Sequence, residues 1–383
     1  MPSKAIAVAA GGGGDVVSAS VLAAKLRHRF DVVAVMSYSW DRLIVDPIPG
    51  PRCVDDFDGL VRHHDLVAEV TEATRLRGAG WSTLPPLVPY LAHPLLLVDP
   101  TNGALGVAAQ FRAASRIFDA EALILVDIGG DILAEGHEDG LRSPLADSLM
   151  LAAATQADLA LHLLVAGIGL DGELTRDELR ALLRRHDAVE AAQLGKEDVS
   201  AAADVWAWHP SEANGLLCVA AGGWRGTVET QRGALVRVDD EAGTVHEVDT
   251  DSVATNSLAA VLADTVSLDQ AEQRIRDRRG YSDIDTERDR LSTGLGNRTP
   301  TTAVLRKIDR YALSASLRGV DALTIRRVFE LTGAIGAHAG DTVRDLLGRE
   351  RPRNMQPPLY LTRGHLNRTA REPDENADLS TGF

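Results

Sequence analysis

Cysteine is almost absent from this 383-residue chain, which contains only Cys53 and Cys218. Two cysteines with no CxxC pair and no neighbouring histidine cluster exclude a disulfide scaffold and provide no zinc-finger spacing. We therefore expect both thiols to be free and the protein to work in a reducing, cytoplasmic setting.

Long apolar runs are also missing. No stretch of about 18 uninterrupted apolar residues occurs, so we expect no transmembrane helix and no membrane partner. The N-terminal run KAIAVAA (residues 4–10) is short and ends at glycine. That pattern favours a first strand over the hydrophobic segment of a signal peptide.

Positive charge is in deficit. The chain has 40 Lys and Arg residues against 55 Asp and Glu residues, a formal net charge of −15. This balance argues against a nucleic-acid groove or an anionic membrane surface as the main partner. A small anionic ligand remains compatible with it, because helix N-termini and local arginines hold phosphate groups in acidic proteins too. We expect a small-molecule ligand.

Several catalytic signatures are lacking as well. The histidines form no HxH or HExxH motif, and no GxSxG nucleophile motif occurs. The first glycine-rich segment is neither a dinucleotide fingerprint nor a phosphate-binding GxxxxGK[ST] loop. The second predicted strand ends in SYSW rather than in an acidic residue, which disfavours hydride transfer with a dinucleotide. The sequence thus gives no ready-made enzyme class.

What the chain does contain is a regular alternation of strand-length apolar runs and helix-period segments. Unbroken apolar strands separated by helices indicate a parallel sheet covered on both faces. We predict a doubly wound, mostly parallel, Rossmann-like α/β fold. The predicted strands are 4–10, 31–38, 94–99, 121–129 and 157–169, and the predicted helices are 15–30, 103–118, 143–157 and 175–186.

The second half of the chain has a different texture. We predict a further apolar strand at GLLCVAAGG (215–223) and a hairpin around DDEAG within residues 226–250. Helical segments follow, and the amphipathic ones after residue 300 make a homodimer a candidate state. The predicted units are a Rossmann-like domain (1–295), a helical extension (296–350) and a proline-rich tail (351–383) whose last fifteen residues we expect to be disordered.

Glycine-rich, aspartate-bearing loops follow the predicted strands. Ligands bind beyond the carboxyl ends of parallel strands, so these loops should converge on one rim. A strand–glycine–helix arrangement can hold phosphate on backbone N–H groups. For GGGGD the alternative is a tight turn in which Asp15 is the helix N-cap. The loops are GGGGD (11–15), DPTNG (99–103), DIGGD (127–131), GIGLDGE (167–173) and AAGGWRG (220–226).

Asp127 and Asp131 are the predicted catalytic and metal-binding residues. Asp127 ends a buried strand and Asp131 follows a Gly-Gly bend, so the pair could hold Mg²⁺, bind ribose or sugar hydroxyls, or share a proton for acid–base chemistry. The alternative is that they cap turns. Asp147 is a weaker candidate, and we interpret Glu138 and Asp139 as a solvated loop face.

The remaining predicted site residues are ligand-binding. Asn102 could bind a base or an amide, or only form an Asn-Gly turn. Arg225 could bind an anion, while Trp224 could stack on an aromatic ring or only pack on the end of the sheet. The predicted ligand-binding residues are Gly11, Gly12, Gly13, Gly14, Asp15, Asn102, Gly129, Gly130, Gly223 and Arg225.

Six segments in this order resemble the domain of unknown function 1152 family of archaea and some bacteria. They are GGGGDVVSA, WDRLIVDPIPGPR, DPTNGALGVAAQF, VDIGGDILAEG, RSPLADSLMLAA and YSDIDTERD. The resemblance covers about residues 4–290 and leaves the residues beyond about 300 outside it. It implies a shared fold, but the family has no established activity, so it implies no catalytic roles.

Three functional hypotheses follow. The first is an enzyme acting on a nucleotide such as ATP or on a phosphorylated small molecule, of transferase or hydrolase type, with Mg²⁺ as a candidate cofactor. The second is a metal-independent enzyme acting on a sugar or an amino-acid-like ligand. The third is a non-catalytic binding or assembly protein whose glycines serve packing.

Overall fold

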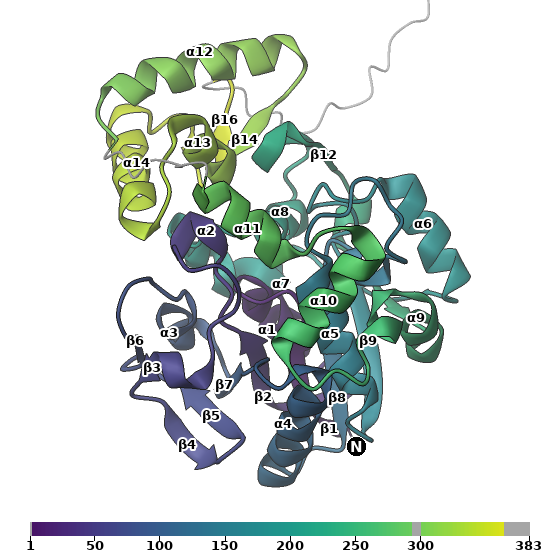
Figure 1. The fold of residues 1–383 in the computed structure, drawn as a ribbon. Coiled ribbons are helices and arrows are strands. Elements are labelled where there is room, and N and C mark those ends of the chain that lie inside the picture. Colours follow the sequence, from purple (N-terminus) through teal and green to yellow (C-terminus); the bar gives the residue numbers. More distant parts are fainter. Residues whose placement is uncertain (1, 293–299, 364–383) are drawn as a thin grey trace, which may run out of the picture.

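A nine-stranded sheet forms the centre of the computed structural model, which describes residues 2–292 and 300–363 (Figure 1). The strands lie in the order β10-β13-β9-β8-β1-β2-β7-β5-β4. Their bounds are β1 Ser3–Ala9, β2 Phe30–Tyr38, β4 Val61–His64, β5 Val67–Val70, β7 Leu95–Val98, β8 Ala122–Ile128, β9 Ala160–Ala166, β10 Val189–Gln193 and β13 Thr244–Val248.

The five central strands of this sheet are parallel. Strands β1 and β2, β2 and β7, β1 and β8, and β8 and β9 pair in the parallel sense, while the outer strands pair antiparallel. Counted in chain order, the parallel strands lie 3-2-1-4-5 across the sheet, which is the doubly wound Rossmann order 3-2-1-4-5-6 without its sixth strand. The predicted fold class is confirmed.

Helices cover both faces of the sheet because its strands are apolar on both sides. Ile6 and Val8 of β1 belong to the core under one face, and Ala5 and Ala7 to the core under the other, as the two-residue period of a strand requires. Helices α4 Gly103–Phe118, α5 Pro144–Thr155 and α10 Leu268–Arg279 pack on the first face, and α1 Asp15–Lys25, α7 Lys196–Val199 and α8 Glu212–Ala221 on the second.

Shorter elements complete the main unit. The remaining helices are α2 Arg42–Val45, α3 Leu84–Leu87, α6 Arg176–Arg185, α9 Thr250–Asn256 and α11 Asp283–Ser292. A small antiparallel pair is formed by β3 Phe57–Asp58 and β6 Arg75–Leu76.

The C-terminal helices pack around a second sheet of five strands. Its order is β12-β11-β14-β16-β15, and a separate apolar core that includes Ile308, Phe329 and Leu347 lies beneath α12, α13 and α14. These elements are β11 Gly226–Glu229, β12 Leu235–Val238, β14 Ala322–Thr324, β15 Met355–Gln356, β16 Leu359–Leu361, α12 Ala303–Leu317, α13 Ile325–Thr332 and α14 Ala337–Glu350.

Two local predictions are wrong. The apolar run 215–223 is not a strand but most of helix α8, because a short apolar segment fits a fully buried helix as well as a buried strand. DDEAG is not the turn of a hairpin: residues Glu241–Gly243 form a 3₁₀ turn between the two sheets, and β13 pairs with β9 and β10. The hairpin present is β11–β12.

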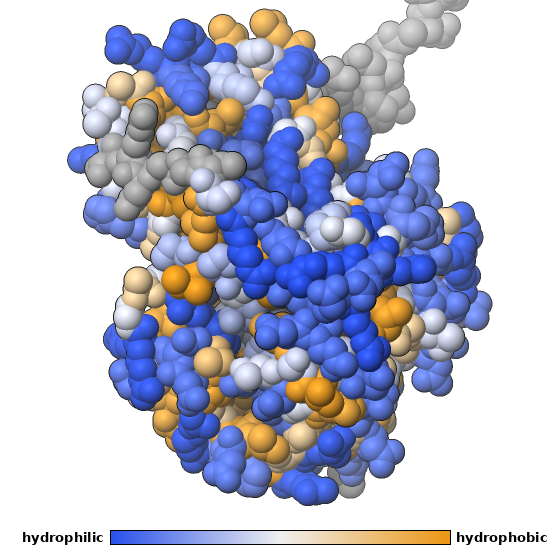
Figure 2. Space-filling model, viewed as in Figure 1, coloured by the Kyte–Doolittle hydropathy of each residue, from blue (hydrophilic) through white to orange (hydrophobic). Residues whose placement is uncertain are grey.

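The surface matches a chain rich in charge. The face in Figure 2 is mostly hydrophilic, with apolar groups over the C-terminal helices. Leu313 and Leu317 of α12 are exposed. In the ranges 2–292 and 300–363, no helix has the length and apolar character needed to cross a membrane. Residues 369–383, which we predicted to be disordered, lie outside the described residues.

Candidate functional site

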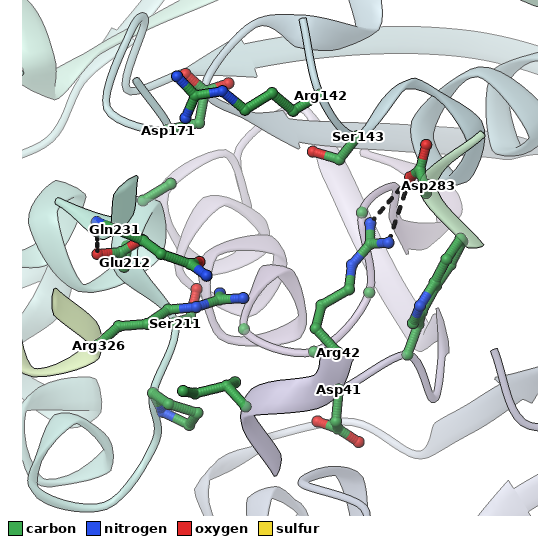
Figure 3. Close-up of a pocket in the computed structure, with 18 of the residues that line it drawn as sticks. Asp41, Arg42, Arg142, Ser143, Asp171, Ser211, Glu212, Gln231, Asp283 and Arg326 are labelled. Atoms are coloured by element: carbon green, nitrogen blue, oxygen red, sulfur yellow. Dashed lines mark hydrogen bonds and ion pairs between the residues drawn. The ribbon is translucent and has the colours of Figure 1, made fainter. Parts of the chain in front are cut away.

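A cavity of about 220 Å³ lies beyond the carboxyl ends of the central strands (Figure 3). Its walls include the loops that follow β1, β2, β8 and β9, so it lies where the strand order reverses, between β1 and β8. Arg232, Arg326 and Ile335 close it from the side of the second sheet. Ligands of open α/β folds bind at this reversal point.

The four consecutive glycines allow the backbone to come close to two carboxylates and to α8. A Cβ on Gly11 would lie 2.7 Å from Asp15 Oδ2 and 3.1 Å from Asp147 Oδ1, and one on Gly14 would lie 2.5 Å from Ser211 Oγ. Gly12 has a φ of +84°, which a side chain would make costly. The glycines therefore do more than form a turn.

Asp15 is held by hydrogen bonds on both of its oxygens. Gly11 N donates to Asp15 Oδ2 at 2.8 Å, and Asn214 Nδ2 donates to Asp15 Oδ1 at 2.6 Å. The N-cap position belongs to Gly14, so the N-cap interpretation of Asp15 is wrong: it is the first helical residue of α1. Burial raises the pKa of Asp15 to about 6, although the hydrogen bonds from Asn214 and Gly11 oppose that shift.

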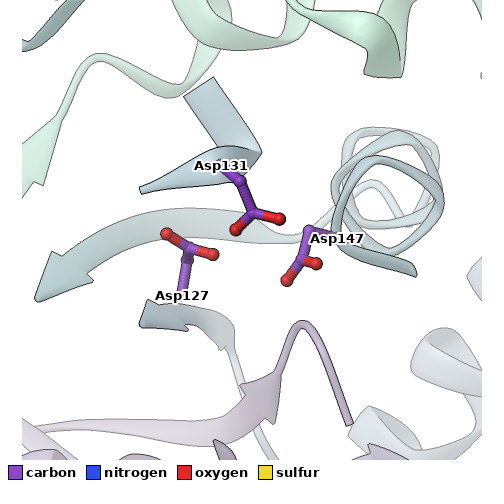
Figure 4. Close-up of side chains that lie close together, drawn as sticks. All are labelled: Asp127, Asp131 and Asp147. Carbon is purple, nitrogen blue, oxygen red and sulfur yellow. The ribbon is translucent and has the colours of Figure 1, made fainter. Parts of the chain in front are cut away.

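Three buried aspartates come together beside this loop (Figure 4). One carboxylate oxygen from each of Asp127, Asp131 and Asp147 lies within 4.8 Å of the other two. Asp127 is the second-to-last residue of strand β8. Asp131 directly follows Gly130, whose φ is +103°, and Asp147 lies in the first turn of α5. We call Asp127, Asp131 and Asp147 the acidic triad.

The acidic triad is electrostatically unbalanced. Burial, followed by repulsion from neighbouring carboxylates, raises the pKa of all three side chains well above the ordinary value. Asp127 is 1% exposed; its Oδ2 accepts a hydrogen bond from Gly130 N, and no N–H or hydroxyl among the described residues donates to its Oδ1, although a protonated Asp131 carboxyl can donate to Asp127. A buried polar atom without a partner is costly, so this oxygen calls for a proton or a cation.

The spacing of the acidic triad fits a divalent cation. Oxygen ligands lie about 2.0–2.6 Å from Mg²⁺ or Ca²⁺, so one ion can bridge oxygens separated by up to about 5 Å. Asp171, in the middle of the loop after β9, extends the acidic region: burial raises its pKa to about 7, and its Oδ2 also has no partner within the described part of the chain. Asp171 lies against Gly129, where a Cβ would overlap its carboxylate.

Arginines line the same cavity. Arg42 stacks on the ring of Trp40 at 3.8 Å and contacts Asp283 at 3.3 Å and Glu287 at 3.5 Å. Burial alone would lower the pKa of Arg42, but these carboxylates raise it overall, so the guanidinium stays charged. The arginines at the cavity are Arg42, Arg142, Arg232, Arg290 and Arg326.

Two of these arginines have a strained backbone. Arg42 and Arg232 have φ values of 56° and 64°, in the left-handed region. The other non-glycine residues described with positive φ are aspartates, which tolerate this conformation better. For arginine it costs about 1–2 kcal/mol, and such strain clusters at functional sites.

Helix N-termini add further positive potential. Helices α1, α5, α8 and α13 all begin at the cavity, with Asp15, Ser143, Ser211 and Arg326 among its lining residues. The first backbone N–H groups of a helix carry partial positive charge and bind anions. The cavity thus combines an acidic region with groups that attract anions.

The structure brings together only part of the predicted site. Gly11, Gly12, Gly13, Gly14, Asp15 and Asp131 line the cavity, and Asp127 lies against Asp131 through the acidic triad. Gly129 and Gly130 do not line it, but they contact Asp171 and hold Asp127.

Asn102, Gly223 and Arg225 lie outside the cavity. Asn102 is at the N-terminus of α4. Gly223 follows α8, and since Ser211 begins that helix, the helix length of about 15 Å separates the two. Arg225 instead donates to Asp240 Oδ1 at 2.6 Å and to the Ala220 carbonyl.

The loop before α5 departs from its predicted form. Glu138 is buried, and its carboxylate accepts hydrogen bonds from Glu135 N and Gly136 N, so the prediction of a solvated side chain is wrong for Glu138. Asp139 is exposed.

A family model described as protein of unknown function (DUF1152) matches residues 6–291. The chain belongs to this family. No curated protein and no solved structure matches the chain. The matched segment of this DUF1152 member contains the loop of residues 11–15, which we call the glycine loop, and the acidic triad, whereas Arg326 lies beyond it.

Sequence reasoning missed Asn214 and the arginines that line the cavity. Asn214 lies on α8, which the sequence suggested as a strand, and Arg326 lies on a helix far along the chain. Arg42 could have been found, because the segment SWDR (39–42) directly follows the second parallel strand of this DUF1152 chain.

Proposed function

We propose that this protein is an enzyme that binds a nucleotide or another phosphorylated small molecule and uses a divalent cation, with Mg²⁺ the first candidate, in transferase or hydrolase chemistry. The observation that carries the proposal is the unpartnered Oδ1 of Asp127, buried within the acidic triad and next to the glycine loop. Cation-binding and anion-binding groups in one cavity match a metal-bound phosphate.

Asp127, Asp131 and Asp147 are the residues that would hold the cation. A bound divalent cation would supply charge neutralisation and polarise a phosphoryl oxygen. The chain contributes a rigid arrangement of ligands: Asp127 is fixed by the Gly130 N–H, and Asp147 by its place in the first turn of α5. Rigid placement of this kind lowers the cost of assembling the site.

The phosphate would lie against the glycine loop and the arginines. Asp15, Asp147 and Ser211 lie so close to Gly11 and Gly14 that the loop has no room for side chains at these positions. The N-termini of α1 and α8 and the guanidinium of Arg42 supply positive charge there. Arg42 is already oriented by Trp40 and Asp283.

Thermal-shift measurements with ATP, GTP, UDP-sugars, inorganic phosphate, free sugars and amino acids, each with and without Mg²⁺, test the proposal. We expect a rise in melting temperature for a phosphorylated ligand that depends on Mg²⁺. The rise should be lost in Asp131→Asn and kept in Asp139→Asn, a matched control in an exposed position of the following loop. A response only to free sugars or amino acids would support the metal-independent enzyme, and no response to any ligand would favour a binding or assembly protein.

A further inference from the structure

Two side chains at the cavity, His209 and Arg326, have buried hydrogen-bond donors without a partner among the described residues. His209 is 4% exposed and lines the cavity; its Nδ1 accepts a hydrogen bond from Ser211 N at 3.2 Å. The ring proton is therefore on Nε2, which makes Nε2 a donor. Nε2 is buried and has no hydrogen-bond partner among the described residues.

Arg326 supplies the other donor. It is the second residue of α13, it lines the cavity, and its buried Nε has no partner among residues 2–292 and 300–363. Figure 3 shows its side chain extending toward the middle of the cavity. Glu212 faces it, but Glu212 Oε1 already accepts hydrogen bonds from Gln231 N and the Thr324 hydroxyl.

The surroundings of Arg326 are strongly basic. Burial lowers its pKa, and the nearby charges of Arg42, Arg290 and Arg232 lower it further, while Glu212 opposes them. His209 feels the same charge: burial lowers its pKa to about 3, with Arg344 and Arg326 contributing, so the imidazole is neutral at pH 7. Converging cations repel one another unless an anion lies between them.

We propose that Arg326 and His209 form a second anion subsite, which binds an oxyanion of the ligand other than the one next to the acidic triad. This inference rests on the proposed function and narrows its substrate class. A ligand with two anionic groups in sequence, such as a diphosphate, would place one group at the cation of the acidic triad and the other between Arg326 Nε and His209 Nε2. A monophosphate would fill only one of these positions.

The subsite also gives a role to the second sheet with helices α12, α13 and α14, which we call the C-terminal unit. Arg326 lies outside the residues 6–291 that the family model matches, on a helix packed against the second sheet. Arg326 and Ile335 reach the same cavity as the glycine loop. The C-terminal unit therefore supplies part of the specificity of this chain.

Isothermal titration calorimetry with pyrophosphate and with orthophosphate, both in excess Mg²⁺, tests this inference on the full chain. The wild-type protein should bind pyrophosphate more tightly than orthophosphate. Arg326→Ala should weaken pyrophosphate binding about tenfold or more, because it removes a hydrogen bond between two charged groups, and should leave orthophosphate binding within about twofold. Arg306→Ala, at an exposed position of α12 in the same unit, is the matched control and should change neither affinity.

Unchanged pyrophosphate binding in Arg326→Ala, or equal affinity of the wild type for the two anions, would overturn the subsite. If circular dichroism shows that Arg326→Ala is misfolded, Arg326→Lys and His209→Gln replace it; lysine keeps the charge but lacks the planar fork, so partial loss is expected. Binding of Mn²⁺ alone is measured on the same variants. Normal Mn²⁺ binding with unchanged pyrophosphate affinity refutes only the subsite, whereas absent Mn²⁺ binding in the wild type refutes the proposed function.

Discussion

Asn214 Nδ2 donates a 2.6 Å hydrogen bond to Asp15 Oδ1, and so joins α8 to the first residue of α1 across 199 positions of sequence. The same amide group donates to Ser211 Oγ at 3.0 Å, and Asn214 Oδ1 accepts from the Ser18 hydroxyl. All four side chains are therefore ordered as one network. This network fixes the glycine loop between two helix N-termini.

Replacing Asn214 with aspartate should disrupt this network. The new carboxylate cannot donate to Asp15 and repels it, and both groups are buried. Leaving a buried acceptor unpaired costs about 1–3 kcal/mol, so the free energy of unfolding should fall by that amount in urea denaturation. Asn102→Asp, at the exposed N-cap position of α4 where Asn and Asp are about equally favoured, is the control and should change stability by less than about 0.5 kcal/mol. Equal effects of the two substitutions would contradict this role of Asn214.

Adding a methyl group at Gly11 should damage the site. The Cβ of Gly11→Ala would lie 2.7 Å from Asp15 Oδ2, so the loop or the carboxylate must move. We expect a loss of about 1–3 kcal/mol in stability and a weaker response to phosphorylated ligands. Gly348→Ala on α14, where no atom lies within 4 Å of the new Cβ, should instead stabilise the protein by about 0.5–1 kcal/mol. Chemical denaturation measures the free energy of unfolding of both variants. An unchanged free energy of unfolding in Gly11→Ala would argue against the close approach of Gly11 to Asp15.

Neutralising Asp147 should separate stability from function. Its carboxylate is buried beside Asp127 and Asp15, and their repulsion destabilises the protein when no cation is bound. Asp147→Asn should therefore raise the melting temperature in EDTA while abolishing any further rise on adding Mg²⁺ or Mn²⁺. A variant that melts lower in EDTA and still responds to metal would show that Asp147 has a structural role only.

Stability at low pH should depend on Glu247. Its hydrogen bond with His162, and then its contacts with Arg29, lower its pKa from 4.5 to about 2. Because the folded-state pKa is below the unfolded value, the folded protein binds fewer protons, and this stabilisation is lost as pH falls from about 5 to 2. Glu247→Gln should cost about 1–2 kcal/mol at pH 7 and much less at pH 3.

Urea denaturation at the two pH values measures the contribution of Glu247. Glu197→Gln, at an exposed position of α7, should show no such pH dependence. A Glu247→Gln penalty that is equally large at pH 3 and pH 7 would rule out the charge as its source.

The sequence predicted the sheet well because buried parallel strands are marked by unbroken apolar runs. The β1, β8 and α1 segments lie where the periodicity placed them, and the residues around Asp15 and Asp131 do share one cavity. The run 215–223 failed because burial on all sides removes the period that tells helix from strand. Gly223 and Arg225 were placed at the rim only through that error.

The basic half of the cavity could not be predicted from local pattern. Arg232 and Arg326 come from the second sheet and its helices, and only the packing of that unit onto the first brings them to the glycine loop. Asp147 was undervalued because a helix-capping role explains an acidic residue in the first turn of α5 equally well. Only the tertiary structure brings Asp147 close to Asp127.

Direct measurement of Mn²⁺ binding to the wild-type protein and to Asp131→Asn, by electron paramagnetic resonance titration, tests the central claim that the acidic triad holds a divalent cation. The wild type should bind one Mn²⁺ per chain, Mg²⁺ should compete for the site, and Asp131→Asn should lose it while Asp139→Asn keeps it. A wild-type protein that leaves all Mn²⁺ free in solution, or an Asp131→Asn variant that binds it as tightly, would contradict the claim.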